Sequence, residues 1–331
     1  MKTINKLGYL FIALLCIVSC SDDTYKPGAH PSVRGQGVFF GSEDNFVTVE
    51  LEPDSPTEFE IELTRMDTEN TVSVGVKVVN NEENVFSLPE TVTFEAGNEK
   101  AYIPVSFPEA EIGVAYRLEV ELTGDNVNVY SEQKTQIAYE VSRIKWDAID
   151  GGIYMDGMIV SFYGVPYPDG CSSYVEAQIA TFPTGDQRIR IINPYKAATD
   201  DPDENGIADG YLYNGEEDVI NNNVKMLIDI SGNTATMKPG ALGFDWGEGE
   251  FIAGSVNPYL PNNFEEYPAR EDYPKGEVVY ADEEETVISY IVFPSESLYL
   301  IEGPYATIVA ENTYFFFSLE AYKEVMLSDV E

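Results

Sequence analysis

Between residues 46 and 141 the chain alternates apolar with polar or charged residues at a period close to two. The pattern recurs in runs bounded by Asn, Asp, Gly or Pro: 46–51, 58–63, 72–78, 102–107, 116–122 and 136–141. An antiparallel sheet that covers a single core has one apolar and one charged face, as these runs would. About seven short strands within about 110 residues predict a β-sandwich.

The second half of the chain carries strand signals of the same kind. Runs at 174–178, 188–192, 224–230, 277–280, 286–293 and 314–319 indicate strands, and only 319–327 indicates a short terminal helix. About 300 mature residues fit two domains better than one. We therefore expect an all-β chain, with an N-terminal β-sandwich at 34–143 and a second β-rich domain, a sandwich or a barrel, at 144–331.

The first twenty residues predict a secretory signal. Lys2 and Lys6 precede an apolar run at 10–18, which is shorter than the roughly 20 residues of a membrane-spanning helix. The residues Ile-Val-Ser-Cys at 17–20 then match a bacterial lipobox. We predict a signal peptide at 1–19, cleavage before Cys20 and acylation of that cysteine. The alternative is an ordinary cleaved signal with an incidental cysteine.

Acylation of Cys20 would make the membrane a partner of the mature chain. Several acyl chains, at about 0.8 kcal/mol per buried CH₂, anchor a protein stably without spanning the bilayer. Residues 20–33 are polar and hold two prolines, so they predict an extended, lipid-bearing tether.

Charge excludes several classes of partner. Loss of residues 1–19 would leave 17 basic against 58 acidic residues, a formal charge of −41. Such a field repels nucleic acid and anionic lipid, and it disfavours strongly anionic polysaccharides unless a cation bridges them. Aromatic residues make up 12% and hydrophobic residues 44% of the chain, so we expect folded cores and not disorder.

Histidine and cysteine usage excludes most nucleophilic and zinc chemistry. The single histidine, His30, lies in the tether, which excludes a Ser-His-acid or Cys-His hydrolase and a histidine-ligated zinc. Once Cys16 is cleaved off and Cys20 is acylated, Cys171 has no partner for a disulfide. We interpret Cys171 as a small residue beside a turn.

Paired carboxylates leave no sequence signature, so a glycoside hydrolase stays open as an alternative. Glu248 and Glu250 beside Trp246 form the most tempting pair, and a Gly-rich acidic loop with a packed indole is the simpler interpretation. The chain has neither a phosphate-binding loop nor a dinucleotide fingerprint. We expect no enzymatic activity and assign no catalytic residue.

The sharpest local motif lies at 201–210, Asp-Pro-Asp-Glu-Asn-Gly-Ile-Ala-Asp-Gly. Oxygen ligands would come from the side chains of Asp201, Asp203, Asn205 and Asp209 and from the carbonyl of Ile207. Leu212 stands where an EF-hand has its bidentate glutamate, so the loop is not an EF-hand. It resembles the calcium loops of thrombospondin type 3 repeats, in a single copy. A structural Ca²⁺ is one interpretation and a plain acidic turn is the other; no cofactor is otherwise required.

Tyrosines mark a candidate ligand site. Tyr259, Tyr267 and Tyr273 lie in the Pro-rich stretch 257–274. Proteins bind sugars with exposed aromatic rings that stack on the C–H faces of the sugar, while nearby polar groups form hydrogen bonds with its hydroxyls. Loops on rigid β scaffolds often carry such sites. The alternative is that these tyrosines fill half-buried positions, which tyrosine favours in sheets.

Two stretches carry family resemblances. Residues 88–105, in which a Phe-Glu-Ala-Gly turn leads to Ile-Pro-Val, resemble a Calx-β-type immunoglobulin-like module, and the resemblance covers about 36–143. It implies the sandwich fold but transfers no calcium ligands. From Trp146 on, Gly-Ile-Tyr-Met-Asp at 152–156, Val-Glu-Ala-Gln at 175–178 and Asn-Pro-Tyr at 193–195 resemble the C-terminal β domain of Bacteroidetes surface lipoproteins that accompany glycan-uptake systems.

These resemblances imply a function and a location. Ser21, Asp22 and Asp23 resemble the export signal that sends such lipoproteins to the outer face of the outer membrane. We expect a non-catalytic surface lipoprotein that binds a polysaccharide or assists its uptake, with an outer-membrane glycan importer of the starch-utilisation type as partner. One alternative is a structural or adhesive protein-interaction lipoprotein. The other is a carboxylate-dependent glycan-active enzyme.

Overall fold

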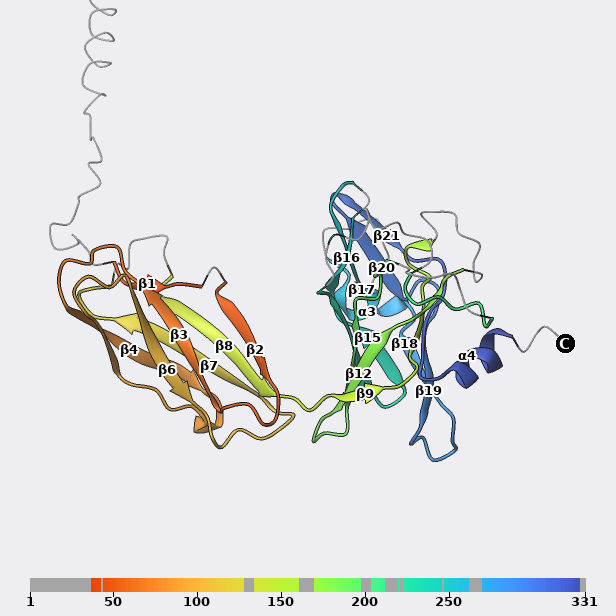
Figure 1. Ribbon diagram of the computed structural model, residues 1–331, viewed down its shortest axis with the longest axis horizontal. Helices are drawn as coiled ribbons and strands as arrows, with labels where there is room; N and C mark the ends of the chain where they lie inside the picture. The colour runs from red at the N-terminus through yellow and green to blue at the C-terminus, as the bar shows by residue number, and fades with distance from the viewer. Residues whose placement is uncertain are drawn as a thin grey trace, which may run out of the picture. The chain divides into compact units, whose positions relative to one another are not determined.

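The computed structural model describes residues 37–42, 44–127, 134–160, 170–197, 204–211, 220, 223–245, 247–261 and 270–327. The chain divides into two compact units. The second comprises Ser142–Glu331 with the short segments Leu51–Asp54 and Glu111–Val114, and the remainder forms the first. Strands dominate both units (Figure 1), so the expected all-β fold is confirmed.

The first domain is a sandwich of two sheets. One sheet has the order β1-β3-β6, with β1 at Phe39–Phe40, β3 at Glu58–Thr64 and β6 at Lys100–Ser106. The other has the order β2-β8-β7-β4-β5, with β2 at Phe46–Leu51, β8 at Gln136–Arg143, β7 at Ala115–Thr123, β4 at Val72–Asn81 and β5 at Thr91–Phe94. A 3₁₀ turn, η1 (Glu82–Asn84), follows β4.

The period-two pattern of the sequence becomes the core of this sandwich. On β6 the side chains of Ile103 and Val105 are buried while their neighbours are exposed, and on β7 Leu118 and Val120 are fully buried. Each such aliphatic side chain contributes about 1.5–3 kcal/mol when it leaves water. The alternation therefore predicted correctly which face of these strands is buried.

A buried arginine organises the loops at the end of β3. Arg65 is only 1% exposed, and its guanidinium lies over the ring of Phe94 at 5.2 Å. It donates to the backbone carbonyl oxygens of Asn98 (2.7 Å), Asn70 (2.6 Å), Thr68 (3.3 Å) and Glu95 (2.8 Å). One side chain thus joins two loops that lie about 30 residues apart in the sequence.

The second domain is built on a ten-stranded sheet with the order β11-β10-β22-β19-β18-β15-β14-β13-β12-β9. Its strands are β9 (Asp147–Ile149), β10 (Ile153–Met155), β11 (Ser172–Tyr174), β12 (Glu176–Thr181), β13 (Gln187–Ile192), β14 (Lys225–Ser231), β15 (Thr234–Met237), β18 (Gly276–Tyr280), β19 (Ile288–Phe293) and β22 (Thr313–Phe316).

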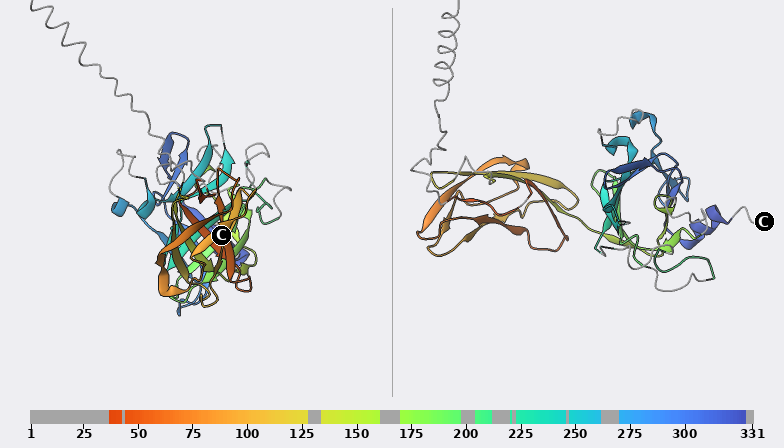
Figure 2. Two further views of the ribbon diagram at one scale, coloured as in Figure 1. Left: turned by 90° about the vertical axis from the view of Figure 1, so that its left-hand side faces the viewer. Right: turned by 90° about the horizontal axis from the view of Figure 1, so that it is seen from above.

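This sheet closes on itself. β9 pairs with β12 and β10 pairs with β11 in nearly continuous antiparallel register, and the N–H of Val175 donates to the carbonyl of Gly152 across the break. Gly151, at a φ of 76°, makes the bulge that bends β9 into β10. Because the two pairs of segments are bent single strands, the ten-stranded sheet forms an eight-stranded meander barrel that β22 closes onto β10. Figure 2 shows this ring in its right-hand view.

Two inserted hairpins and a terminal helix complete the domain. β16 (Gly240–Asp245) with β17 (Glu250–Ser255), and β20 (Leu298–Glu302) with β21 (Tyr305–Ile308), form a four-stranded sheet. The short helical segments α3 (Val256–Tyr259) and η2 (Arg270–Asp272) follow β17. Helix α4 (Leu319–Met326) begins at Ser318, whose side chain accepts from the N–H of Ala321, and it confirms the predicted terminal helix.

Apolar side chains fill the barrel. Ile189, Ile228, Ile291 and Phe315 alternate with outward residues on their strands and are at most 1% exposed. They join one continuous cluster that extends to Phe244 and to other residues of the inserted hairpins. Among the described residues no helix has the length and apolar character to cross a membrane.

Candidate functional site

A buried carboxylate lies at one end of the barrel. Asp156 follows β10 and has no exposed surface. Its oxygens accept from the hydroxyls of Tyr154 (3.1 Å), Tyr195 (2.7 Å) and Tyr211 (2.7 Å) and from the backbone N–H groups of Met158 (2.9 Å), Ile159 (3.0 Å) and Val160 (3.2 Å). Tyr195 also lies edge-on to Tyr154 and Tyr211. We call Asp156 and the three tyrosines the acid hub.

Burial keeps the tyrosines of the acid hub protonated. Removal from water, followed by the charge of Asp156, raises the pKa of Tyr154, Tyr195 and Tyr211 well above the ordinary value for tyrosine. The three hydroxyls therefore remain donors to Asp156. A buried charge is tolerated when its hydrogen-bond capacity is filled, so this arrangement anchors the chain segments that meet at the barrel end.

The acid hub gives physical meaning to two sequence motifs. The Gly-Ile-Tyr-Met-Asp segment supplies Tyr154 and Asp156, and the Asn-Pro-Tyr turn supplies Tyr195. β10 and β13 run in the same direction round the meander, so the residues that follow them reach the same end of the barrel. Tyr211 was missed by the sequence reasoning, because a single tyrosine after a loop carries no distinguishing signal.

The candidate calcium loop lies partly outside the described residues, which exclude Asp201 and Asp203. Asn205 is half-buried, and the side chain of Ile207 is buried in the core. The carboxylate of Asp209 is 2.9 Å from Nζ of Lys196. No group of three or more metal-ligating side chains occurs in the described part of the chain. The loop leads directly into Tyr211, so a calcium ion there would also steady the acid hub.

The structure brings together two of the three predicted tyrosines. Tyr259 and Tyr273 are both half-buried and pack on one small cluster formed by Val256, Leu260 and Tyr299. Tyr267 lies outside the described residues. The clustering of Tyr259 with Tyr273 agrees with both interpretations of this stretch, a ligand surface and a packed one.

A second tyrosine surface was not predicted. Tyr290 on β19 and Tyr314 on β22 are half-buried on the outer face of the barrel, where both rings lie beside the buried ring of Phe316. The ring centroids of Tyr314 and Phe316 are 5.4 Å apart with planes at 10°, and Tyr290 lies 5.6 Å from Phe316 and 6.2 Å from Tyr314. We call these three residues the aromatic shelf.

Polar groups surround the aromatic shelf. Nδ2 of Asn312 donates to the hydroxyl of Tyr314 at 3.1 Å. Partial burial, followed by the nearby Tyr314, Glu277 and Glu324, raises the pKa of Tyr290. Glu324 lies on α4, which packs along this face through an edge contact between Tyr322 and Phe316. Flat rings, one carboxamide and two carboxylates thus share one surface on a closed, rigid scaffold.

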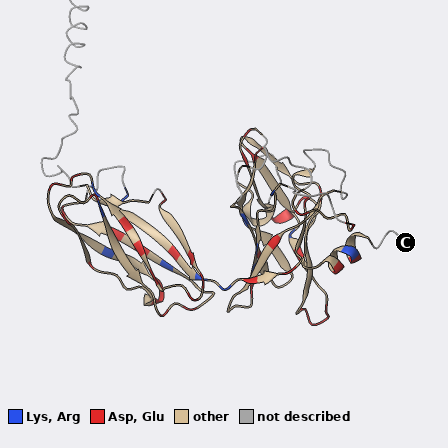
Figure 3. Ribbon diagram, in the orientation of Figure 1, with Lys and Arg blue, Asp and Glu red and all other residues tan. Residues whose placement is uncertain are grey.

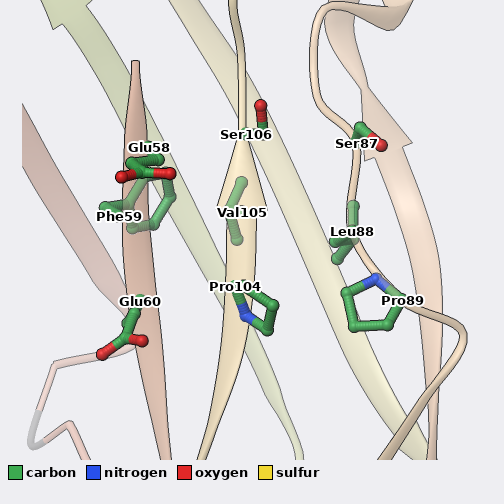
Figure 4. A pocket seen from close by; sticks show the side chains of 9 residues that line it. All are labelled: Glu58, Phe59, Glu60, Ser87, Leu88, Pro89, Pro104, Val105 and Ser106. Carbon is green, nitrogen blue, oxygen red and sulfur yellow. The ribbon is translucent and has the colours of Figure 1, made fainter. Parts of the chain in front are cut away.

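The first domain has a groove of a different character. It has a volume of about 670 Å³ and lies along β3, β6 and the segment 87–89. Figure 4 shows Pro104 and Pro89 on opposite sides of the gap between β6 and that segment, with Glu58 and Glu60 on β3. Ser87 and Ser106 close one end through reciprocal backbone hydrogen bonds of 2.8 and 2.9 Å.

The groove offers acceptors but few donors. Glu58 and Glu60 are exposed, so neither has the apolar surroundings in which a glycosidase holds its acid. The ring of Phe59 is turned to Phe107 and Tyr139, at 5.9 and 5.3 Å. Pro104 has no N–H to offer a further strand, which protects this sheet edge from pairing. Figure 3 shows the acidic residues along β3.

Other predicted residues have plain outcomes. Cys20 and Trp246 lie outside the described residues. Cys171, just before β11, is fully buried and forms no disulfide within the described part of the chain, so its small side chain fills core space. Glu250 accepts from the N–H of Gly243 at 3.0 Å, and Glu248 is exposed.

Comparisons with known proteins give structural similarity at low identity. No family model matches the chain, and no curated protein matches it in sequence. A protein of unknown function from Bacteroides ovatus shares 12% identity, with 85% of this chain and 89% of that one covered, at a TM-score of 0.29. An auxiliary nutrient binding protein from Bacteroides thetaiotaomicron VPI-5482 shares 11%, with 82% and 89% covered, at 0.27.

CBD12 from CALX1.2 shares 10% identity, with 72% of this chain and 90% of that one covered, at a TM-score of 0.28. TM-scores of this size carry no argument about ligands or activity. The functional argument therefore depends on the surfaces of this chain.

Proposed function

We propose that this protein is a non-catalytic, lipid-anchored surface protein that binds a polysaccharide through its second domain. The observation that carries the proposal is the aromatic shelf. Tyr290 and Tyr314 place half-buried rings on the outer face of a closed barrel, beside the amide of Asn312. Sugar rings stack on such surfaces through their C–H faces, while nearby polar side chains form hydrogen bonds with the sugar hydroxyls.

The charges around the aromatic shelf select the class of glycan. Glu277 and Glu324 lie close enough to Tyr290 to contribute to its raised pKa. The whole chain has a formal charge of −39. Carboxylates accept hydrogen bonds from sugar hydroxyls, but they repel uronate or sulfate groups. The ligand we propose is therefore a neutral polysaccharide.

The N-terminal sequence supports the proposed location, and the family resemblance supports the proposed partner. Cys20 would carry the lipid, and residues 20–33 would tether the folded domains to the membrane. The acidic residues after Cys20 support display on the outer face of the outer membrane. In this proposal the first domain is a spacer, the second domain holds glycan, and an outer-membrane glycan importer receives it.

A binding screen tests the proposal. Soluble residues 21–331 are run through native gels that contain plant, host or microbial polysaccharides, with calcium and with chelator. We expect retardation by at least one neutral polysaccharide and none by sulfated or uronate-rich ones. Loss of retardation in chelator would implicate the 201–209 loop. Absence of retardation by every glycan would contradict the proposal and favour the protein-contact alternative, to be pursued by pull-down from intact cells.

A further inference from the structure

A small pocket with several polar side chains lies at the end of the barrel opposite to the acid hub. It has a volume of about 240 Å³ and is lined by residues of the β12–β13 turn, β13, β14 and β15, among them Phe182, Arg188, Asp229, Thr234 and Thr236. The β12–β13 turn follows β12, which runs antiparallel to β10, so this turn lies away from Asp156. We call this depression the barrel-end pocket.

Three polar side chains of the pocket form one row. Arg188 on β13 is the register partner of Asp229 on β14, which is the partner of Thr236 on β15. Directly paired residues point to the same face of a sheet. Ile189 and Ile228, the neighbours in the chain, are buried in the barrel, so the row points outward. The side chains of Arg188 and Asp229 are 22% and 33% exposed.

The ion pair has a fixed geometry. Nε of Arg188 donates to Oδ1 of Asp229 at 2.5 Å and Nη2 donates to Oδ2 at 3.3 Å, so the fork is bidentate along one edge. The Nη1 edge of the guanidinium is turned away from Asp229. The guanidinium carbon lies 5.4 Å from the ring centroid of Phe182. The pocket thus presents N–H donors, a carboxylate acceptor and an aromatic ring side by side.

Tight turns hold these groups in place. The N–H of Phe182 donates to the carbonyl of Asp186 at 2.9 Å, and the hydroxyl of Thr184 donates to the Asp186 carboxylate at 2.9 Å. On the other side, β14 and β15 are joined by two residues, with Gly232 at a φ of 56°. A site formed by such hairpins loses little conformational entropy on binding.

The charges at this pocket nearly balance, unlike those of the chain as a whole. Arg188 and Lys238 face Asp229, whose Oδ2 is 3.7 Å from Nζ of Lys238, and Asp186 lines the rim. Elsewhere acids greatly outnumber bases. A balanced set of donors and acceptors fits an uncharged ligand that is rich in hydroxyls.

We propose that the barrel-end pocket binds a single uncharged pyranose ring, a chain-end or side-branch unit of the glycan. The inference rests on the proposed function and names a site apart from the aromatic shelf. Its volume lies below the roughly 300 Å³ at which pockets for larger ligands begin, so one ring fits and a chain does not. Asp229 would accept from one ring hydroxyl while Arg188 donates to its neighbour and Phe182 contacts a C–H face.

Small sugars test this site directly. Methyl pyranosides of glucose, galactose, mannose and xylose are titrated into ¹⁵N-labelled residues 21–331, and amide shifts are followed by NMR. We expect one of these sugars to shift the amides of Thr234 and Thr236 most. Asp229→Asn and Arg188→Lys, which keep the size or the charge of the side chain, should each weaken that binding about tenfold or more.

The control is an ion pair of the same type in the first domain. Lys77 and Glu121 face each other across two strands with Nζ and Oε2 at 2.7 Å, so Glu121→Gln removes a comparable charge. We expect this variant to bind as wild type does. Thermal unfolding of each variant verifies that loss of binding does not come from loss of folding.

The outcomes separate this inference from the proposed function. If no pyranoside shifts Thr234 and Thr236 while a polysaccharide still retards the protein, the pocket proposal fails and polysaccharide binding stands. If the Asp229 and Arg188 variants bind the sugar as wild type does, the pocket proposal also fails. If neither small sugars nor polysaccharides bind the wild-type protein, both proposals fall.

Discussion

The two domains each bury a charged side chain, and they satisfy it in opposite ways. In the first domain Arg65 donates to four backbone carbonyls. In the second, Asp156 accepts from three tyrosine hydroxyls and three backbone N–H groups. Within the described residues, neither charge is paired with an opposite charge. Dipoles from several segments replace the counter-ion, so each side chain joins loops that the chain order keeps apart.

The surfaces of the two domains differ more than their cores do. The first domain presents an acidic groove in which the aromatic ring of Phe59 is turned to its own core. The second presents a cluster of half-buried tyrosines and a pocket in which Arg188 and Asp229 offer donors beside acceptors. Sugar recognition needs all of these groups together. On this comparison we propose a spacer role for the first domain and binding for the second, and the following predictions probe that proposal.

The largest expected effect comes from Asp156→Ala. The substitution leaves three hydroxyls and three N–H groups without their acceptor, so we expect the free energy of unfolding to fall by about 3–5 kcal/mol. Both tryptophans, Trp146 and Trp246, belong to the second unit, so urea unfolding followed by tryptophan fluorescence reports on that domain. Asp156→Asn, which keeps one acceptor oxygen, serves as the milder control. A loss below about 1 kcal/mol for Asp156→Ala would contradict the anchoring role.

High pH should lower the free energy of unfolding of the second domain more than that of the first, with an effect nearly as large as that of Asp156→Ala. The raised pKa values of Tyr154, Tyr195 and Tyr211 mean that these tyrosines ionise near pH 10 only in the unfolded chain. Their stabilisation is full below pH 10 and is lost as pH rises above it. At pH 11 the three together would cost the second domain about 4 kcal/mol.

Among the described residues of the first domain, Tyr139 is the comparable group. Burial raises the pKa of Tyr139 to about 12, so its stabilisation is lost between pH 10 and 12. Urea unfolding at pH 8 and pH 11 should show a larger fall for the fluorescence transition than for a first-domain probe, such as backbone amide exchange at β6 and β7. Equal falls in the free energy of unfolding of both domains would contradict the expected difference between them.

Arg65→Met should act on the first domain alone. It removes the donors of four carbonyls while it keeps an apolar stem over Phe94, so we expect a loss of about 2–4 kcal/mol. Far-UV circular dichroism should reveal an earlier transition, while the fluorescence midpoint stays unchanged. A shift of the fluorescence midpoint would show that the two domains do not unfold independently.

Tyr211→Phe gives a smaller and graded test of the acid hub. It deletes one hydroxyl of the three that donate to Asp156, so the expected loss is about 2 kcal/mol in the fluorescence transition. Tyr305→Phe, at a tyrosine that is 63% exposed on β21, should change stability by less than about 0.5 kcal/mol. If the Tyr211 variant were as stable as the Tyr305 control, the stabilising role of Tyr211 in the acid hub would be contradicted.

Chelation should have the smallest effect. If the 201–209 loop holds calcium, EGTA lowers the melting temperature of the second domain by a few degrees, because the ion binds only the folded loop. Asp201→Asn should abolish this calcium dependence, and Asp44→Asn in the first domain should leave it intact. An unchanged melting temperature in EGTA would remove the ion from the account.

Sequence reasoning succeeded where the signal was local. The run 46–51 is β2, and the runs 136–141 and 224–230 agree with β8 and β14 within two residues. Apolar and polar residues alternate along these strands because one face is buried and the other is exposed to solvent. The helix at 319–327 also agrees with α4 to one residue.

Long-range pairing left no signal to read. β22 closes the barrel against β10, and no local pattern connects Tyr314 with Met155. For the same reason the motifs that contain Tyr154, Asp156 and Tyr195 were noticed without their convergence. The aromatic shelf and the Arg188–Asp229 pair arise from register between neighbouring strands, which single-strand periodicity does not encode. Cys20, Tyr267, Asp201 and Asp203 stay predictions outside the described residues.

The most direct test of the account compares one surface in each domain. Tyr290→Ala combined with Tyr314→Ala removes the two tyrosine rings of the aromatic shelf. Tyr102→Ala removes a first-domain tyrosine that is 46% exposed beside Glu62. The measurement is retardation of soluble residues 21–331 in a gel that contains the polysaccharide bound by the wild-type protein. The account predicts that the double variant runs as if no glycan were present and that Tyr102→Ala is retarded like wild type. Full retardation of the double variant, or its loss in Tyr102→Ala, would contradict it.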